Sequence, residues 1–149
     1  MSSGRSIITL TIALTLGAGT LAAQRRPAVF PVSVGDLTAA QLVEVRDLDG
    51  QVVLNGTLKT SSNKVNEIER KADLDSPTGG KADGKISIEI ERKESRDLVE
   101  TSDEIEFSAS HLPAMAQFEL FIDRRPVASF MTTKDGKGQV KLERKSTGG

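Results

Sequence analysis

The chain contains no cysteine, tyrosine or tryptophan, and only one histidine. Without cysteine there is no thiol nucleophile, thiol redox pair, zinc–thiolate site or disulfide, so a secreted form depends on its apolar core alone. The lack of tyrosine and tryptophan removes two large aromatic side chains that stack on ligands such as sugars. Basic and acidic side chains nearly balance, at 20 and 21, and both signs are interspersed. We therefore expect no nucleic-acid partner, which would require a clustered basic face.

Residues 1–23 have the pattern of a signal peptide. Arg5 supplies the early positive charge, residues 7–16 form an uncharged apolar run, and residues 17–23 are small and neutral before Gln24. The apolar run is too short for a bilayer core, which takes about 20 residues. We predict that residues 1–23 are removed and that the product is secreted or periplasmic, without membrane insertion. An amphipathic or buried N-terminal helix is the alternative.

The rest of the chain has the length of one domain. We divide it into an extended lead-in (24–40), a single β domain (41–144) and a short tail (145–149). Pro31 argues against a central strand in the lead-in, and residues 36–40 suit one short turn of helix.

Alternation of apolar and polar residues predicts seven to eight strands. The clearest alternation is that of Ile86, Ile88 and Ile90, which are β-branched. Residues 67–75 also fit a helix; we favour a strand because Leu74 fits the period-two pattern, although Arg70 interrupts it. The other predicted strands cover residues 42–46, 52–58, 104–109, 118–122, 127–132 and 139–143, and polar residues 60–66 and 93–102 are predicted to be loops.

The stretch from Phe118 to Leu142 predicts three strands joined by two tight turns. The first turn is placed at Arg124–Pro126, and the second at Asp135–Gly136, a strong hairpin signal because glycine accepts a positive φ. In the middle strand, Val127 and Met131 are expected to share one face. Gly56, within residues 52–58, is expected to form a β-bulge.

Two segments of the chain resemble each other. A spacing of 75 residues separates Val43 from Phe118 and also Val52 from Val127, and both Asp83–Lys93 and Asp135–Lys145 read as a turn, a strand and then Glu-Arg-Lys. These patterns indicate two three-strand units, the first with a long insertion; chance similarity of hairpins is the alternative.

From these strands we predict an all-β fold, an antiparallel β-sandwich in which two sheets cover each other's apolar faces. The layout over residues 42–143 resembles small exported bacterial modules of the immunoglobulin-like or related β-sandwich type. The resemblance rests on turn and strand patterns, and it implies no functional residues.

His111 is the first candidate for chemistry, because Ser108 and Ser110 precede it. A hydrolase triad also needs a carboxylate to orient the imidazole and a donor for the oxyanion. No Gly-x-Ser-x-Gly motif occurs, so we interpret His111 as an exposed or capping side chain.

Asp47 and Asp49 are the best metal-ligand candidates, with Asp73, Asp75 and Asp83 as further oxygen donors. Calcium outside the cell is commonly bound by such oxygens, but an EF-hand loop starting at Asp47 lacks the required glycine and glutamate. A looser calcium site stays open, and turn chemistry is the simpler interpretation.

Glu100, Asp103, Glu104 and Glu106 are dense enough to suggest paired-carboxylate glycosidase chemistry. Glu104 and Glu106 share one face of the predicted strand. That face lacks an aromatic platform, so a solvated sheet face is the simpler interpretation.

Arg124 and Arg125 form a possible contact for an anion or a protein. They equally suit a soluble hairpin tip that discourages pairing at a sheet edge.

These observations predict a non-enzymatic binding or structural module of the periplasm or cell exterior, with no cofactor. The expected partner is another envelope or secreted protein. A calcium-stabilised adhesion domain and a carboxylate-dependent exported hydrolase are the alternatives.

Overall fold

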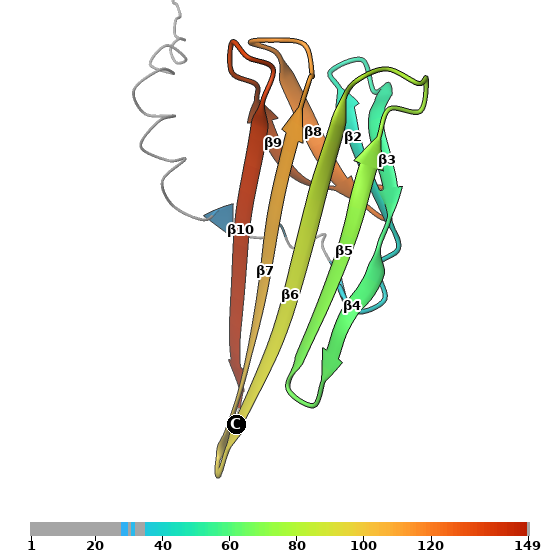
Figure 1. The fold of residues 1–149 in the computed structure, drawn as a ribbon. Coiled ribbons are helices and arrows are strands. Elements are labelled where there is room, and N and C mark those ends of the chain that lie inside the picture. The colour runs from blue at the N-terminus through green and yellow to red at the C-terminus, as the bar shows by residue number, and fades with distance from the viewer. Residues whose placement is uncertain (1–27, 30, 32–34, 149) are drawn as a thin grey trace, which may run out of the picture.

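The structure, a computed structural model, describes residues 28–29, 31 and 35–148 (Figure 1). The predicted signal peptide therefore lies outside the described residues. Within these ranges the chain is all-β, and none of it forms a helix long and apolar enough to cross a membrane. The strands are β1 (Ala28–Val29), β2 (Leu42–Asp47), β3 (Val52–Thr57), β4 (Lys59–Lys64), β5 (Glu67–Asp75), β6 (Asp83–Ser95), β7 (Leu98–Ser110), β8 (Gln117–Ile122), β9 (Arg125–Met131) and β10 (Gly138–Gly148).

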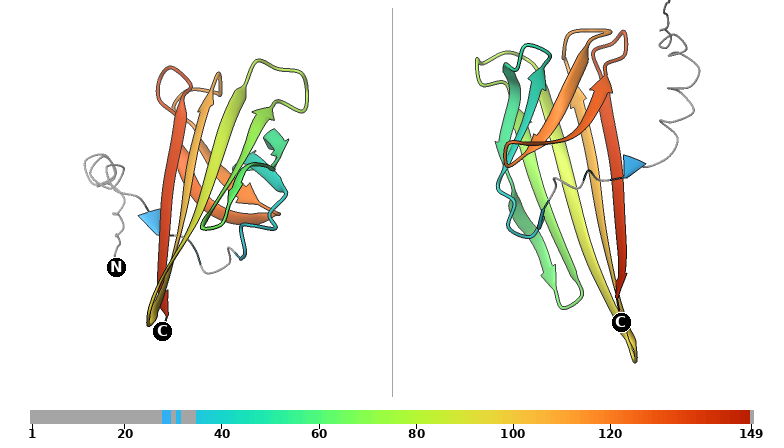
Figure 2. Two further views of the ribbon diagram at one scale, coloured as in Figure 1. Left: turned by 60° about the horizontal axis from the view of Figure 1, so that its bottom comes forward. Right: turned by 180° about the vertical axis from the view of Figure 1, so that it is seen from behind.

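The strands form one hydrogen-bonded sheet in the order β1-β10-β7-β6-β5-β3-β2-β8-β9, with β4 paired to β5. All pairs are antiparallel except β1 with β10. The sheet curls so that β8 and β2 pass behind β7 and β6, which gives a nearly barrel-shaped molecule (Figures 1 and 2). The all-β antiparallel prediction is confirmed. The predicted sandwich of two separate sheets is not, because a continuous ladder runs from β10 to β9.

The apolar core fills the inside of this curled sheet. Ile88 on β6 lies between Ile105 on β7 and Arg70 on β5, and Leu142 on β10 lies on the far side of Ile105. The three aliphatic side chains are buried, as the alternation predicted. Residues 67–75 form a strand, which confirms the preferred interpretation.

Two segments predicted to be loops are strands. Residues 59–64 form β4 against β5, and residues 93–102 belong to a long β6–β7 hairpin whose turn is only Arg96–Asp97. Both segments are polar and mostly exposed, so they lack the apolar alternation from which a strand is predicted. Strand β10 also continues to Gly148, through residues assigned to a tail.

Gly56 is not a bulge. A side chain there would overlap the carbonyl oxygen of Asp73 and lie 2.7 Å from a methyl group of Leu74, so Gly56 marks the close approach of β3 to β5. The register shift of the β2–β3 hairpin falls instead between Val45 and Arg46.

The turn at Asp135–Gly136 forms as predicted, with a positive φ of 75° at Gly136. The predicted hairpin pairing does not form, because β9 and β10 lie at opposite ends of the sheet order. The β8–β9 ladder also has a register shift between Leu120 and Phe121, so side chains along β9 do not alternate regularly between the two faces of the sheet. Val127 and Phe130 are both buried, whereas Met131 is exposed, so the predicted pairing of Val127 with Met131 on one face is wrong.

Chain segments close both ends of the barrel. At the end with the β7–β8 and β9–β10 connections (top of Figure 1), Leu112 is buried and its N–H donates to the carbonyl of Gly136 at 3.1 Å. At the other end residues 35–41 place Leu37 and Ala40 in the core. Residues 36–40, predicted to form one turn of helix, form a tight turn instead, in which Ala40 N–H donates to Leu37 O at 3.3 Å.

Four strands at one end of the sheet order are arranged symmetrically. Strands β2 and β8 are neighbours, and their hairpin partners β3 and β9 lie outside them. The two three-strand units suggested by sequence correspond to β2, β3, β6 and β8, β9, β10, and their duplication stays a prediction.

Candidate functional site

Asp47 serves the turn between β2 and β3. Its Oδ1 atom accepts the backbone N–H groups of Asp49 and Gln51, both at 2.9 Å, which is the turn chemistry considered above. Asp49 is exposed. In the part of the chain that the structure describes, no group of three or more His, Asp or Glu side chains is arranged to hold a metal ion.

His111 lies at the start of the β7–β8 connection with a positive φ of 61°. The structure brings the carboxylate that a triad would need close to it, since Nδ1 of His111 lies 3.5 Å from Oδ1 of Asp83. Both side chains are largely exposed. Ser110 is paired with Asp83 across the β6–β7 ladder, but neither Ser108 nor Ser110 is hydrogen-bonded to His111 within the described residues.

The carboxylates of β7 divide between the two faces of the sheet. Asp103 faces the inside, where it accepts a 2.9 Å hydrogen bond from Nε of Arg144. Glu104 and Glu106 face the outside, as predicted for that pair. The four residues therefore do not form a single site.

A row of four glutamates crosses the outer face of the sheet. The register places Glu69 of β5, Glu89 of β6, Glu104 of β7 and Glu143 of β10 side by side. We call this the glutamate row. Like charges directly opposite each other destabilise a sheet. Desolvation, and then the neighbouring carboxylates, raise the pKa of Glu89.

Lysine side chains form ion pairs with the glutamates at the two ends of the glutamate row. Glu69 lies 3.6 Å from the ammonium of Lys71, and Glu143 lies 3.9 Å from that of Lys145. Within the described residues, Glu89 and Glu104 in the middle form no ion pair. The row thus concentrates negative charge at the centre of the β5–β6–β7–β10 face.

Beyond the glutamate row, three strands project past the body of the protein (Figure 1). We call this part, residues 91–102 and 144–148, the charged ribbon. The ladder between β5 and β6 ends at the Glu67–Glu91 pair, so both faces of the ribbon beyond this pair are uncovered. Leu98 at the tip of the ribbon is exposed. A shallow hollow of about 290 Å³ lies on its outer face, lined by Glu89, Glu91, Glu100, Glu104, Glu143 and Lys145 among others.

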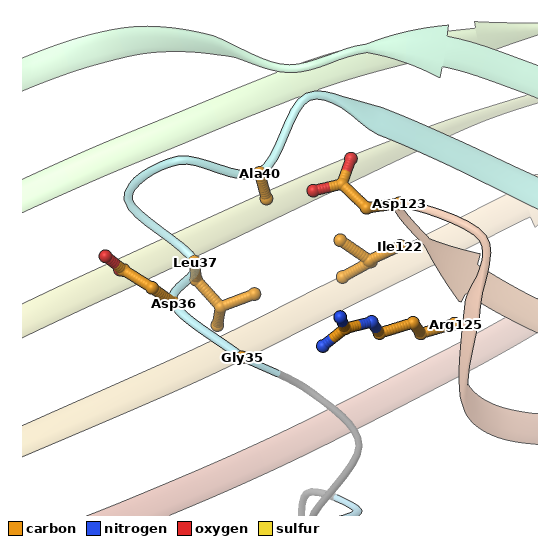
Figure 3. A pocket seen from close by; sticks show the side chains of 7 residues that line it. All are labelled: Gly35, Asp36, Leu37, Ala40, Ile122, Asp123 and Arg125. Atoms are coloured by element: carbon orange, nitrogen blue, oxygen red, sulfur yellow. The ribbon is translucent and has the colours of Figure 1, made fainter.

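Arg124 and Arg125 have different positions. Arg124 is in the β8–β9 turn, which consists of Asp123 and Arg124 with φ values of 49° and 67°; the turn thus begins one residue earlier than predicted. Arg125 begins β9 and lines a cavity of about 200 Å³, with its guanidinium pointing toward Leu37 (Figure 3).

Sequence analysis gave no role to three residues that organise this end. Arg70 is buried and donates to backbone carbonyls. Asp123 accepts the N–H groups of Gln41 and Leu42 at 3.0 and 2.9 Å. The side-chain and backbone hydrogen bonds from Thr38 lower the pKa of Asp36. The sequence contains one indication of the role of Arg70, because this charged residue occupies an inward position in a strand of alternating apolar residues. Nothing comparable in the sequence pointed to Asp123.

No protein-family model matches the chain, and neither does any curated protein or solved structure. The resemblance to exported immunoglobulin-like modules therefore stays a prediction.

Proposed function

We propose that this protein is an exported, non-enzymatic module that binds a protein partner through the charged ribbon. The partner class is another secreted or envelope protein. The ribbon itself is the observation that carries the proposal, because it extends the sheet without burying any apolar side chain of its own.

Ordering such an extension is unfavourable unless something compensates. Fixing the backbone costs roughly 1–2 kcal/mol per residue, and a ribbon with no apolar face has little stability of its own. A projecting sheet with uncovered faces and edges suits contact with another chain, including strand addition at an edge. The glutamate row at its base places like charges opposite each other, with lysines beside only its two end members, and such departures from a pairing rule are expected where a surface serves function.

The non-enzymatic part of the proposal is supported by the scatter of the candidate groups. Asp103 is occupied by Arg144 on the inner face, Glu104 and Glu106 lie outside, and His111 is at the opposite end of β7 from the ribbon. No described cavity gathers a nucleophile, a base and an oxyanion donor, which acyl transfer requires.

The test is capture of partners from the native envelope and secreted fractions with two variants. In the shortened variant, an Asn-Gly turn replaces residues 92–101, so that the Glu91–Ser102 pair, of the same hydrogen-bonded type as Ser95–Leu98, closes the hairpin. In the control, Asn-Gly replaces Leu48–Asp49, in the β2–β3 turn. We expect the full chain and the control to capture one shared protein and the shortened variant to lose it, with its melting temperature retained. Retention of that protein by the shortened variant, or no shared protein, contradicts the proposal.

A further inference from the structure

We propose that residues 35–40 act as a releasable plug, which leaves the lower end of the barrel by a local opening while the sheet stays folded. The plug is the last part of the lead-in and comes just before β2 (Figure 3). Only two of its side chains, Leu37 and Ala40, are buried in the core. The apolar contribution that holds the plug is therefore small compared with that of a core strand.

A buried cation holds the plug without an acidic partner. Arg70 is 8% exposed, and its Nη1 donates to the carbonyls of Leu37, at 3.4 Å, and Ala40. Its Nη2 donates to Leu58 O at 3.3 Å, and its buried Nε has no partner. Within the described residues no carboxylate pairs with Arg70.

This arrangement makes opening less costly than the hydrogen bonds alone suggest. Burying an unpaired charge is unfavourable, because the protein replaces only part of its hydration. When the plug leaves, Arg70 regains water, and the loss of its carbonyl partners is offset in part.

The plug also keeps its own shape. Oδ1 of Asp36 accepts the backbone N–H of Thr38 at 2.9 Å and its hydroxyl at 2.6 Å. Together with the turn hydrogen bond between Ala40 and Leu37, these contacts are internal to the segment. Opening therefore does not require the turn to unfold.

One side of the plug is loosely packed. The 200 Å³ cavity separates Leu37 and Ala40 from Ile122 and Arg125 of the β8–β9 hairpin (Figure 3). On that side Leu37 and Ala40 face an open cavity large enough for water and not a packed side chain, so few packing contacts are lost there on opening.

The hinge is fixed at the start of β2. Asp123 accepts the N–H groups of Gln41 and Leu42, and the N–H of Leu58 donates to Gln41 O at 2.7 Å. These contacts hold the chain just after Ala40, so the opening unit ends there.

The absence of cysteine allows a direct test by thiol labelling. Ala40→Cys places a reporter in the plug, and Ala72→Cys, a substitution of equal size at a buried site of β5, is the control. Under native conditions we expect the plug thiol to react at least about tenfold faster, at a rate insensitive to low denaturant, as for a local opening. The control thiol should react only through global unfolding, with a steep denaturant dependence. Leu37→Cys serves as a second plug reporter if Ala40→Cys does not fold.

Equal labelling rates, or an equally steep denaturant dependence at both sites, would overturn the proposal, because the plug would then open only with the whole sheet. The result does not depend on the charged ribbon, so the two proposals succeed or fail separately.

Discussion

Asp123 shows how one side chain connects a turn to a distant strand. It has a positive φ of 49°, in a turn where neither central residue is glycine, and its carboxylate accepts two N–H groups at the start of β2. Asp123→Ala removes that acceptor, and we expect a loss of about 1–3 kcal/mol in the free energy of unfolding. Asp123→Asn keeps an oxygen acceptor and tolerates the turn conformation, so it should lose much less. Equal losses in urea unfolding would show that the acceptor is unimportant.

Glu89 lies in the middle of the glutamate row, between Glu69 and Glu104. Its pKa is raised in the folded protein by desolvation and by its glutamate neighbours. The stability linked to a raised carboxyl pKa is present below the ordinary glutamate pKa and is lost as pH rises through the folded value. Glu89→Gln removes this loss, and we expect a more stable protein at pH 7 whose advantage disappears at acidic pH.

The control for Glu89→Gln is Glu106→Gln on the same outer face. Glu106 lies opposite Ser87 on one side and Lys141 on the other, so removing its charge should give no gain. Melting temperatures measured between pH 4 and pH 8 would separate the two variants. A gain of equal size in both would contradict the role of the glutamate row.

At the scale of single residues, the sequence predicted faces better than roles. Alternation placed Glu104 and Glu106 together outside, which the structure confirms, and it placed Arg70 on an inward position without explaining it. The explanation is the pair of carbonyls from Leu37 and Ala40, which lie 33 and 30 positions away in the sequence. Sequence periodicity contains no information on such a contact.

At the scale of elements, strands with apolar alternation were predictable and purely polar strands were not. Residues 86–90 and 118–122 bury one face, so their sequence records the burial. Strand β4 contains no apolar residue, and the charged ribbon contains only Leu98 and Val99 at its tip, neither of them fully buried, so the pairing of both is set by the neighbouring strands. The residues of the proposed binding surface were therefore those that the sequence described least well.

Strands β3 and β5 approach closely at Gly56, and this contact gives a test of the element packing. A side chain at Gly56 would overlap Asp73 O, a backbone atom that cannot rotate away. We expect Gly56→Ala to cost about 1–3 kcal/mol, as for overpacking in a core. Gly148→Ala in β10 meets no atom within 4 Å and should be nearly silent. Denaturant unfolding of both variants checks this, and similar values would mean that β3 can shift freely.

At the scale of the whole molecule, the closure of the sheet was not predictable. The Asp135–Gly136 turn was recognised correctly, but a turn does not determine whether the strands on either side pair with each other. Strand β10 pairs with β7 instead, over eleven residues, and this long ladder outweighs any β9–β10 hairpin. The choice depends on the total pairing and burial available to β10, which local patterns do not describe.

Since no ladder joins β9 to β10 within the described sheet, closure depends on side-chain packing at Phe130. Its ring lies 5.3 Å from that of Phe107 on β7 and 5.8 Å from that of Phe118 on β8, and it covers the backbone of Gly138 on β10. Phe130 therefore connects the two ends of the sheet. We expect Phe130→Ala to cost about 3–5 kcal/mol, the range for a buried phenylalanine.

The matched control for Phe130 is Phe121, which lies on the outer face with the guanidinium of Arg46 4.4 Å from its ring centroid. Phe121→Ala loses this contact and partial burial, about 1–2 kcal/mol. Urea unfolding should show the larger loss of stability for Phe130→Ala. If that variant already exposes core surface before it unfolds, the dependence of its unfolding free energy on urea concentration should also change, whereas that of Phe121→Ala should not. If both variants lose the same stability with unchanged slopes, the barrel is closed by its sheet ladders and connections alone, and Phe130 is an ordinary core residue.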